Sequence, residues 1–363
     1  MKIWIATGGT GGHIFPALAV AAAIVKNESA SPTSSQTMGP GLRRGDDIIT
    51  ISTDGRGYDL VMKNKPAGAK VVRVWASGVG NRSAIGKIVA LSKIALSAKA
   101  LFFRFLISRP DRIIAFGGYS SVPAVLAGKI LRIPVFLHEQ NAAAGRANAL
   151  SAKFADKILT SFPGTTGLPK NAKVVLTGLP VRSDFKPSDY NNSNQILITG
   201  GSLGAAILRD VAPEAISMLP AAIKKNLMVV QQVDEASVHR VGKFYAAAGI
   251  KHRLAPFFRD MASEITDAAI VIGRSGASTI AELMVVGRPA VLVPLGINPD
   301  QMANARAFEK LGGGIVIEQK DFSPKQLSRV LTELFENPAR LQKMADAARA
   351  PNEAVRNILR NVL

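Results

Sequence analysis

Thr7-Gly-Gly-Thr-Gly-Gly-His13 is the stretch that decides the fold of this chain, because it directly follows the apolar run Ile3-Trp-Ile-Ala6. Two more glycine-rich stretches also follow apolar runs, Phe116-Gly-Gly-Tyr119 and Gly200-Gly-Ser-Leu-Gly204. Glycine has no Cβ, so its backbone can adopt positive φ and bring N–H groups close to a phosphate at the start of a helix. Three such turns predict two nucleotide-type folds that face one phosphorylated ligand.

Apolar runs and predicted helices alternate along the chain in two series. Strand-like runs lie at 3–6, 48–52, 71–75, 113–115 and 135–138, and a second series lies at 195–199, 227–230, 269–272 and 290–293. Alternation of this kind is typical of right-handed βαβ units in a parallel sheet. The polar, proline-containing stretch 179–194 separates the series. We therefore predict an α/β chain of two domains, each of roughly 150 to 180 residues.

Composition limits the chemistry available to this chain of 363 residues. It contains no cysteine, so a disulfide framework, a thiolate nucleophile and a cysteine-ligated metal are excluded. The N-terminus enters a strand directly, without the charged, apolar and small-residue regions of a signal peptide. We expect no export. The polar stretch 27–45 is predicted to be a loop.

Positive charge is concentrated in the first half. Residues 1–160 hold 21 Lys and Arg against 8 Asp and Glu, a net +13 of the total +19. Between Asp59 and Asp111 there is no acidic residue but there are ten basic ones: Lys63, Lys65, Lys70, Arg73, Arg82, Lys87, Lys93, Lys99, Arg104 and Arg109. This region is predicted to bind an anionic surface.

The helix predicted over 84–108 lies within that basic region. It is long enough to cross a bilayer, but its four cations make a spanning position costly. We expect it to lie on an anionic membrane surface, with an ordinary packed helix as the alternative, because its lysines do not share one helical face. Nucleic-acid binding is disfavoured, since the phenylalanines of 102–105 stand in an aliphatic setting and no nucleic-acid module is recognisable.

The first glycine turn differs from two common phosphate motifs. It lacks the Gly-Lys-Ser/Thr of a Walker A loop, and Ile14 stands where the dinucleotide fingerprint has its third Gly or Ala. NAD binding is therefore disfavoured, and a tight strand-to-helix turn is the simpler alternative to a phosphate site. His13 starts the following helix, where it can act as a general base or as an electropositive neighbour of the turn.

Polar residues follow several strands, at the edge where open α/β sheets bind ligands. His138-Glu-Gln-Asn141 ends one strand, and Tyr119 is expected at the same edge; a polar loop is the alternative. In the second half, Arg274-Ser-Gly-Ala-Ser-Thr-Ile-Ala-Glu282 opens a helix whose N–H groups and Ser275 can receive phosphate oxygens. Glu282 is spaced to accept from ribose hydroxyls, or it is a solvated helix residue. Asp300, Gln301 and Asn304 follow another strand.

These motifs together resemble those of the MurG family, GT-B glycosyltransferases of family 28. The resemblance covers nearly the whole chain in the right order: Gly8-Gly-Thr-Gly-Gly-His-Ile-Phe-Pro-Ala-Leu-Ala19, Phe116-Gly-Gly-Tyr119, His138-Glu-Gln-Asn141, Thr177-Gly-Leu-Pro-Val-Arg182, Gly200-Gly-Ser-Leu-Gly-Ala205, Arg274-Ser-Gly-Ala277 and Asp300-Gln301 with Asn304-Ala305. It implies two Rossmann-like domains with parallel sheets and an inter-domain cleft. The implied boundaries are 1–181 for an acceptor and membrane-associating domain, joined by a last helix of about 347–363, and 182–346 for a UDP-GlcNAc-binding domain.

The resemblance also implies a reaction and its setting. GlcNAc would pass with inversion from UDP-GlcNAc to the 4-hydroxyl of the MurNAc unit of lipid I, giving lipid II for peptidoglycan, with no cofactor and no metal. The implied location is peripheral, on the cytoplasmic face of the bacterial cell membrane. Further implied partners are an anionic membrane surface and cell-wall synthesis and division proteins, and no nucleic acid. Another GT-B glycolipid transferase, such as a diacylglycerol glucosyltransferase, is the alternative.

Roles for individual residues follow from the same resemblance. The implied catalytic residues are His13, Glu139 and Tyr119. The implied UDP-GlcNAc-binding residues are Thr10, Gly11, Gly12, Asn141, Arg182, Ser202, Phe258, Arg274, Ala277, Glu282, Asp300 and Gln301. The acceptor diphosphate would meet Gly9, Gly11, Gly12, Gly117 and Gly118. Asp300 departs from the family pattern, which more often has His or Gln there, although an acidic acceptor can also contact the sugar hydroxyls.

Overall fold

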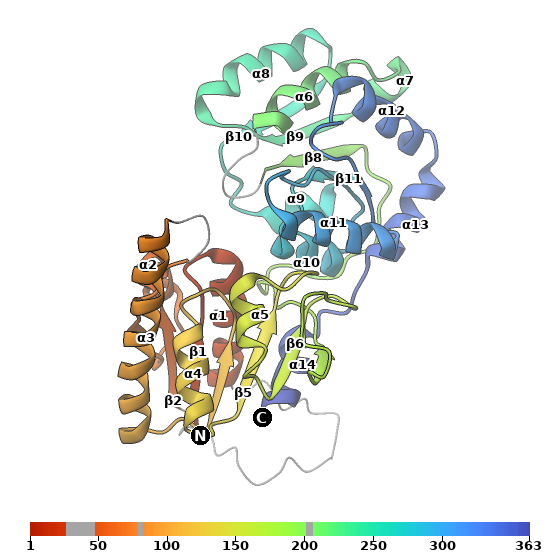
Figure 1. The fold of residues 1–363 in the computed structure, drawn as a ribbon. Coiled ribbons are helices and arrows are strands. Elements are labelled where there is room, and N and C mark those ends of the chain that lie inside the picture. Colours follow the sequence, from red (N-terminus) through yellow and green to blue (C-terminus); the bar gives the residue numbers. More distant parts are fainter. Residues whose placement is uncertain (27–47, 79–82, 201–205) are drawn as a thin grey trace, which may run out of the picture. The chain divides into compact units, whose positions relative to one another are not determined.

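The structure, a computed structural model, describes residues 1–26, 48–78, 83–200 and 206–363. The expected loop 27–45 and Ser202 lie outside the described residues. The chain divides into two compact units. Unit 1 comprises Met1–Arg182 and Glu353–Leu363, and unit 2 comprises Ser183–Asn352 (Figure 1).

Unit 1 is built on a seven-stranded parallel sheet with the strand order β3-β2-β1-β4-β5-β6-β7. Its strands are β1 (Lys2–Ala6), β2 (Ile48–Thr53), β3 (Lys70–Arg73), β4 (Arg112–Ala115), β5 (Val135–Glu139), β6 (Lys157–Thr160) and β7 (Val174–Leu176). The order reverses between β1 and β4. Such a reversal is the topological switch point at which doubly wound sheets bind their ligands.

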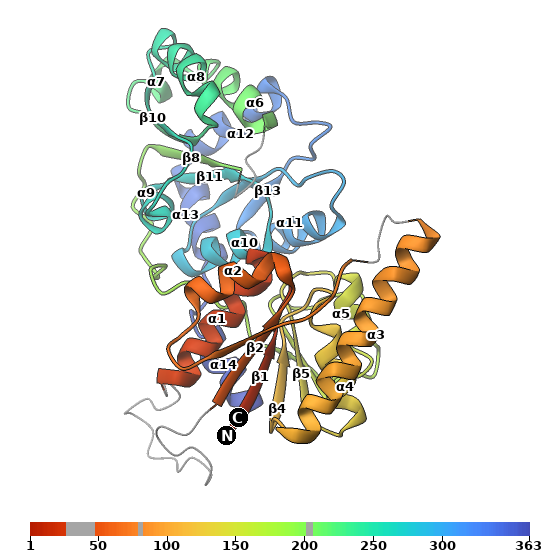
Figure 2. The same cartoon turned by 90° about the vertical axis from the view of Figure 1, so that its left-hand side faces the viewer.

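Helices cover both faces of this sheet because the side chains of β1 alternate between two cores. Ile3 and Ile5 pack with α1 (Gly11–Lys26) and α14 (Ala354–Val362), whereas Trp4 and Ala6 pack with α3 (Ala84–Ile107) and α4 (Val122–Ile130). Figure 2 shows α1 and α14 on one side of the strands and α3 and α4 on the other. The remaining helices of this unit are α2 (Gly55–Asn64) and α5 (Arg146–Ser151).

The end of the chain is part of unit 1. Ile358, Leu359 and Val362 of α14 are buried in the same cluster as Ile3 and Ile5. The backbone carbonyl of Val362 accepts a hydrogen bond from Arg112, and Lys157 donates to Asn361 Oδ1 at 3.2 Å. The last eleven residues thus complete the core of the first half of the sequence.

Unit 2 repeats the same topology with a six-stranded parallel sheet of order β10-β9-β8-β11-β12-β13. Its strands are β8 (Gln195–Thr199), β9 (Met228–Gln232), β10 (Lys251–Ala255), β11 (Ile270–Gly273), β12 (Ala290–Leu292) and β13 (Gly314–Val316). The strand order reverses between β8 and β11, and the third glycine turn follows β8. In the sequence a glycine-rich stretch follows β1 and another follows β8, although residues 201–205 after β8 lie outside the described residues.

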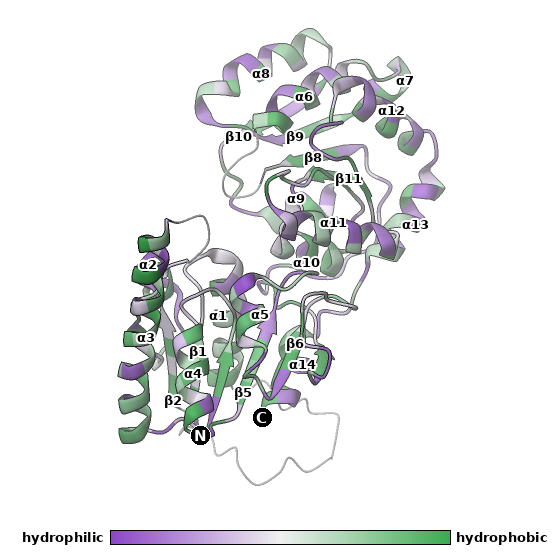
Figure 3. Cartoon of the chain, viewed as in Figure 1, coloured by the Kyte–Doolittle hydropathy of each residue, from purple (hydrophilic) through white to green (hydrophobic). Residues whose placement is uncertain are grey.

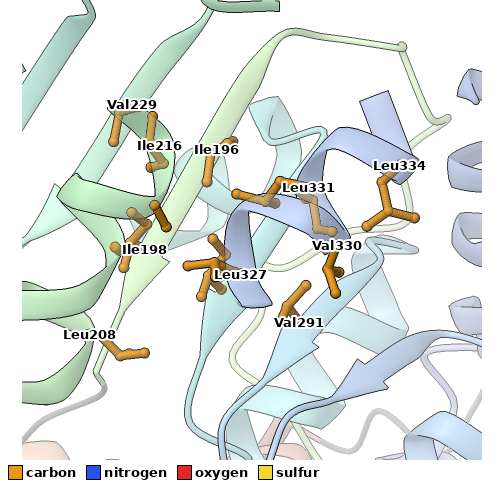
Figure 4. Close-up of a cluster of buried hydrophobic side chains, with 14 of the residues drawn as sticks. Ile196, Ile198, Leu208, Ile216, Val229, Val291, Leu327, Val330, Leu331 and Leu334 are labelled. Carbon is orange, nitrogen blue, oxygen red and sulfur yellow. The ribbon is translucent and has the colours of Figure 1, made fainter. Parts of the chain in front are cut away.

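In the described part of unit 2, eight helices accompany the sheet: α6 (Ala206–Ser217), α7 (Ala221–Lys224), α8 (Glu235–Ala247), α9 (Met261–Asp267), α10 (Ala277–Val286), α11 (Pro299–Leu311), α12 (Pro324–Phe335) and α13 (Pro338–Ala348). One face of the sheet forms a core with α6 and α12. Figure 4 shows Ile196 and Ile198 of β8 close to Leu327 and Leu331 of α12. This packing fixes the strands whose carboxyl ends carry the polar loops.

Helix α3 buries only a narrow stripe of its surface. Ala90, Ile94, Ser97, Leu101 and Phe105 are buried at spacings of three and four residues, while apolar residues on its other sides are exposed. Figure 3 shows hydrophobic residues along α3, interrupted by hydrophilic ones. Among the described residues, no helix combines the length and the apolar character needed to cross a membrane.

Candidate functional site

The first two glycine turns touch each other at the switch point of unit 1. A Cβ on Gly8 would lie 2.7 Å from His13 Cδ2 and 3.1 Å from the carbonyl oxygen of Gly117. A Cβ on Gly118 would lie 2.7 Å from the Cα of Gly8, and Gly117 and Gly118 have φ of +90° and +76°. These positions need glycine because two backbones meet there and because the second turn is left-handed.

The first turn also opens α1, so its N–H groups and the positive end of the helix dipole face the same place. Thr10 and Gly12 are exposed, and Gly9, Gly11 and His13 are half-buried. A Cβ on Gly12 would have no atom within 4 Å. Protein packing therefore does not demand glycine at position 12, and the arrangement suits an anion that approaches the backbone closely.

His13 is held by a residue that the sequence alone did not single out. Its Nδ1 lies 2.9 Å from Oε1 of Gln140, which comes directly after β5. Gln140 is buried and donates from Nε2 to the carbonyl oxygen of Phe116 at 2.9 Å. The only sequence signal for Gln140 was its place in the polar run 138–141, and nothing in that run named His13 as its partner.

Glu139 is completely buried and faces the loop that follows it. Its Oε1 accepts from the backbone N–H of Asn141 at 2.8 Å and from the Asn141 side chain at 3.2 Å. Its Oε2 accepts from Asn148 Nδ2 at 2.7 Å and from Gly145 N at 3.2 Å. Burial raises the pKa of the Glu139 carboxyl, and the surrounding N–H groups oppose that rise. The carboxylate of Glu139 thus fixes loop 141–145. Tyr119, the third expected catalytic residue, is half-buried against Ile94.

In unit 2, hydrogen bonds tie together the loops after β11 and β12. Ser275 Oγ donates to the carbonyl oxygen of Gln301 at 2.8 Å, and Asn304 Nδ2 donates to the carbonyl oxygen of Ser275 at 3.2 Å. Arg274 donates to the carbonyl oxygen of Val293 at 2.8 Å, and Gln301 Oε1 accepts from Leu295 N at 2.9 Å. Arg274 and Gln301 are thereby brought into one hydrogen-bonded loop cluster.

The other residues expected in unit 2 stand on α10, on α11 and shortly before α9. Ala277 is the first residue of α10, Glu282 follows in its second turn, and both are half-buried. Asp300 stands in the first turn of α11 and its N–H donates to Asn298 Oδ1 at 3.0 Å. Phe258 is buried beneath the guanidinium of Arg253, 5.3 Å from the ring centroid. In unit 1, Arg182 is exposed at the last residue before the divide.

Within the described ranges, no three His, Asp or Glu side chains lie close enough together to hold a metal ion.

Two doubly wound parallel sheets, each with one reversal of strand order, are the architecture of a GT-B glycosyltransferase. Residues 37–160 match the glycosyltransferase family 28 N-terminal domain and residues 195–360 match the glycosyltransferase family 28 C-terminal domain, so the chain belongs to this family. The family resemblance and the GT-B fold expected from the sequence are confirmed.

Named relatives are similar over nearly the whole chain. The UDP-N-acetylglucosamine--N-acetylmuramyl-(pentapeptide) pyrophosphoryl-undecaprenol N-acetylglucosamine transferase of Methylobacterium radiotolerans is 37% identical, covering 96% of this chain and 92% of the relative. The transferase of the same name from Granulibacter bethesdensis is 39% identical, covering 96% and 88%. The crystal structure of Acinetobacter baumannii MurG superposes with a TM-score of 0.77 at 29% identity, covering 100% of this chain and 99% of that one.

Proposed function

We propose that this chain is a hexosyltransferase that moves N-acetylglucosamine from UDP-GlcNAc to the 4-hydroxyl of the MurNAc unit of lipid I. The product is lipid II, with a β-1,4 bond formed by inversion, for peptidoglycan synthesis. The observation that carries the proposal is near-full-length similarity, at 36–39% identity, to transferases named for this reaction. The glycine turns of unit 1 and the N-terminus of α10 in unit 2 fit substrates that each carry a diphosphate.

Unit 1 takes the acceptor in this proposal. The backbone N–H groups of the turns at 8–12 and 117–118 bind the lipid-linked diphosphate, supported by the open space at Gly12. His13 takes the proton of the 4-hydroxyl while that oxygen bonds to the anomeric carbon and UDP leaves with the electron pair of the broken bond. Glu139 acts here by fixing Asn141 through two hydrogen bonds, and Asn141 and Tyr119 then orient sugar hydroxyls.

Unit 2 takes the donor. The N-terminus of α10 at the switch point of β8 and β11 stabilises the leaving diphosphate. Glu282 accepts from the ribose hydroxyls, and the backbone of Phe258 meets the uracil. Arg274, Ala277, Asp300 and Gln301 contact the sugar or its approach, and the bonds of Ser275 to the 301–304 segment support their arrangement.

The exposed residues of α3 attach the enzyme to the cytoplasmic face of the cell membrane. We call this set the α3 surface: Ile85, Ile88, Val89, Leu91, Leu96, Phe103, Leu106 and Ile107 with Lys87, Lys93 and Lys99. Ile107 is 90% exposed and Ile85 is 75% exposed. Exposure of large apolar side chains to water is unfavourable, which indicates that a partner surface covers them. Apolar side chains entering the headgroup region with lysines beside anionic lipids satisfy both kinds of residue.

Acceptor choice tests the proposal against its main alternative. We expect UDP release from UDP-GlcNAc with a soluble lipid I analogue and none with diacylglycerol. Release with diacylglycerol alone would favour a different glycolipid transferase.

In the His13→Ala variant we expect turnover to fall by about 100-fold or more, the usual contribution of a general base. Full activity of that variant would reject the role of His13 and leave the transferase assignment intact.

A further inference from the structure

We propose that Gln140 is a positioning residue that fixes which nitrogen of His13 carries the proton, and that His138 holds Gln140 in the orientation this requires. The catalytic meaning of this inference rests on the proposed function, in which His13 is the base. The hydrogen bonds themselves lie within unit 1. They lead from the carbonyl oxygen of Gly178 through His138 and Gln140 to His13.

The orientation of the Gln140 amide is determined by two backbone carbonyls. Nε2 lies 2.9 Å from the carbonyl oxygen of Phe116 and 3.1 Å from that of His138. A carbonyl oxygen can only accept, so the NH₂ end of the amide must face these two groups. The opposite orientation would place Gln140 Oε1 against the carbonyl oxygens of Phe116 and His138, three acceptors in a buried site with no hydrogen to share. Oε1 therefore faces His13.

The amide oxygen in turn decides the tautomer of His13. Oε1 of Gln140 lies 2.9 Å from His13 Nδ1, and an amide oxygen cannot donate. Nδ1 must therefore carry the hydrogen. In a neutral imidazole the other nitrogen, Nε2, then carries the lone pair. This is the form of histidine that can accept a proton from a hydroxyl group at Nε2.

His138 supplies a second, independent constraint on the same amide. Its Nε2 lies 3.0 Å from the carbonyl oxygen of Gly178 and must donate there, so in the neutral ring Nδ1 is an acceptor. That Nδ1 lies 3.2 Å from Gln140 Nε2, again on the NH₂ side of the amide. Burial lowers the pKa of His138 to about 4, which keeps the ring neutral near pH 7. A cationic His138 would instead turn an N–H toward the NH₂ group.

Gly178, whose carbonyl oxygen begins this series of hydrogen bonds, is itself held in place. Gly178 has φ of +83°, and a Cβ there would lie 3.3 Å from the Cβ of Ala354, the first residue of α14. The ring of His138 also lies against Phe116, with 5.3 Å between the centroids. Each member is thus held by backbone or core packing, so the tautomer of His13 is set before a substrate arrives.

Nuclear magnetic resonance of the full chain labelled with ¹⁵N-histidine tests the inference directly. The sequence holds four histidines, so the His13 signals can be assigned by their loss in His13→Asn. We expect neutral His13 to show a protonated Nδ1 and an unprotonated Nε2. A protonated Nε2, or an averaged mixture of both tautomers, in the wild-type protein would overturn the inference.

A matched pair of variants tests the role of Gln140. Gln140→Met removes the amide at similar volume, and Gln231→Met does the same to another fully buried glutamine, whose amide bonds Tyr245 and Leu208 in unit 2. We expect Gln140→Met to show mixed His13 tautomers and a kcat lowered about tenfold or more, with KM for UDP-GlcNAc little changed. Gln231→Met should keep the wild-type His13 signals and kcat.

The outcomes separate this inference from the proposed function. A Gln140→Met protein that keeps the single Nδ1-protonated form would overturn the role of Gln140. Wild-type protein with the expected tautomer but without glycosyl transfer would support the inference and reject the proposed function.

Discussion

Glycine serves two different purposes at the scale of single residues in this site. At Gly8 and Gly118 it allows two backbones to meet. A Cβ on Gly118 would overlap the Cα of Gly8, and a Cβ on Gly8 would overlap His13 Cδ2 and lie 3.1 Å from the carbonyl oxygen of Gly117. At Gly12 no protein atom lies within 4 Å of the position of a Cβ. The first kind of glycine is a requirement of folding, and the second is explained by the close approach of a ligand to the backbone.

Alanine at these positions should separate the two requirements. We expect Gly8→Ala to lower the free energy of unfolding by about 1–3 kcal/mol through overpacking. Gly12→Ala should leave stability unchanged or raise it by up to ~1 kcal/mol, because alanine favours the helix. It should nevertheless raise KM for the lipid I analogue about tenfold, since the methyl group stands before the N–H groups. Urea titration and steady-state kinetics check both values, and an unchanged KM in Gly12→Ala would contradict the diphosphate site.

Burial of His138 gives the stability of unit 1 a pH dependence. The pKa of His138 is lowered to about 4 in the folded protein and returns to the ordinary histidine value of about 6.5 on unfolding. Between these values the unfolded chain binds the extra proton, so folding stability is complete above about pH 6.5 and falls as the pH drops toward 4, by roughly 3 kcal/mol in total. The His138→Gln variant lacks this titration. Urea unfolding at pH 7 and pH 4.5 should show a wild-type loss that the variant does not share, and equal losses would be inconsistent with a neutral buried His138.

At the scale of elements, α3 differs from the other helices of unit 1 because most of its apolar side chains are exposed. Its buried stripe packs on α4, and the α3 surface carries three exposed lysines among large apolar groups. Apolar surface of this kind is costly in water but favourable in the headgroup region of a bilayer.

Charge reversal on α3 should release the protein from anionic vesicles. Each lysine near such a surface contributes about 1 kcal/mol, so Lys87, Lys93 and Lys99 changed together to Glu should weaken binding by at least about 100-fold. The control reverses three exposed lysines of unit 2, Lys225, Lys243 and Lys325. Flotation with phosphatidylglycerol vesicles measures how tightly each triple variant binds the membrane. Equal loss in the two triple variants would mean that total charge, not the α3 surface, drives binding.

Nine of the strands could be predicted from the sequence because buried parallel strands are continuous apolar runs. Strands β6, β7 and β13 were not predicted; each offers only two or three consecutive apolar residues next to polar or glycine residues. Strand β10 was missed because its sequence Lys-His-Arg-Leu-Ala carries three basic or titratable residues. The position of His13 could be predicted from its glycine turn. Its bond to Gln140 could not, because 127 residues separate them and only the strand order brings the two loops together.

At the scale of the whole molecule, the same sheet topology occurs twice, and the end of the chain belongs to the unit in which the chain began. Helix α14 fills a gap in the core of unit 1 with Ile358, Leu359 and Val362. It also packs beside Gly178, whose carbonyl oxygen starts the hydrogen bonds that lead to His13. The C-terminal helix thus contributes both to stability and to the arrangement of the site.

A core substitution in α14 should therefore destabilise unit 1. Ile358 is fully buried, and Ile358→Ala should lower the free energy of unfolding by about 2–5 kcal/mol. Arg360→Ala, an exposed position on the same helix, should change it by less than about 0.5 kcal/mol. Urea titration followed by tryptophan fluorescence is suitable because Trp4 lies in β1. A similar small effect of both changes would show that α14 is not part of the core.

The structure of the reaction product tests the central claim most directly. The full-length protein is incubated with UDP-GlcNAc labelled with ¹³C in the sugar and with a soluble lipid I analogue, and the product is analysed by mass spectrometry and nuclear magnetic resonance. We predict one added GlcNAc, β-linked to the 4-oxygen of MurNAc, with one UDP released for each disaccharide formed. An α-linked product, or UDP release without any disaccharide, would contradict it.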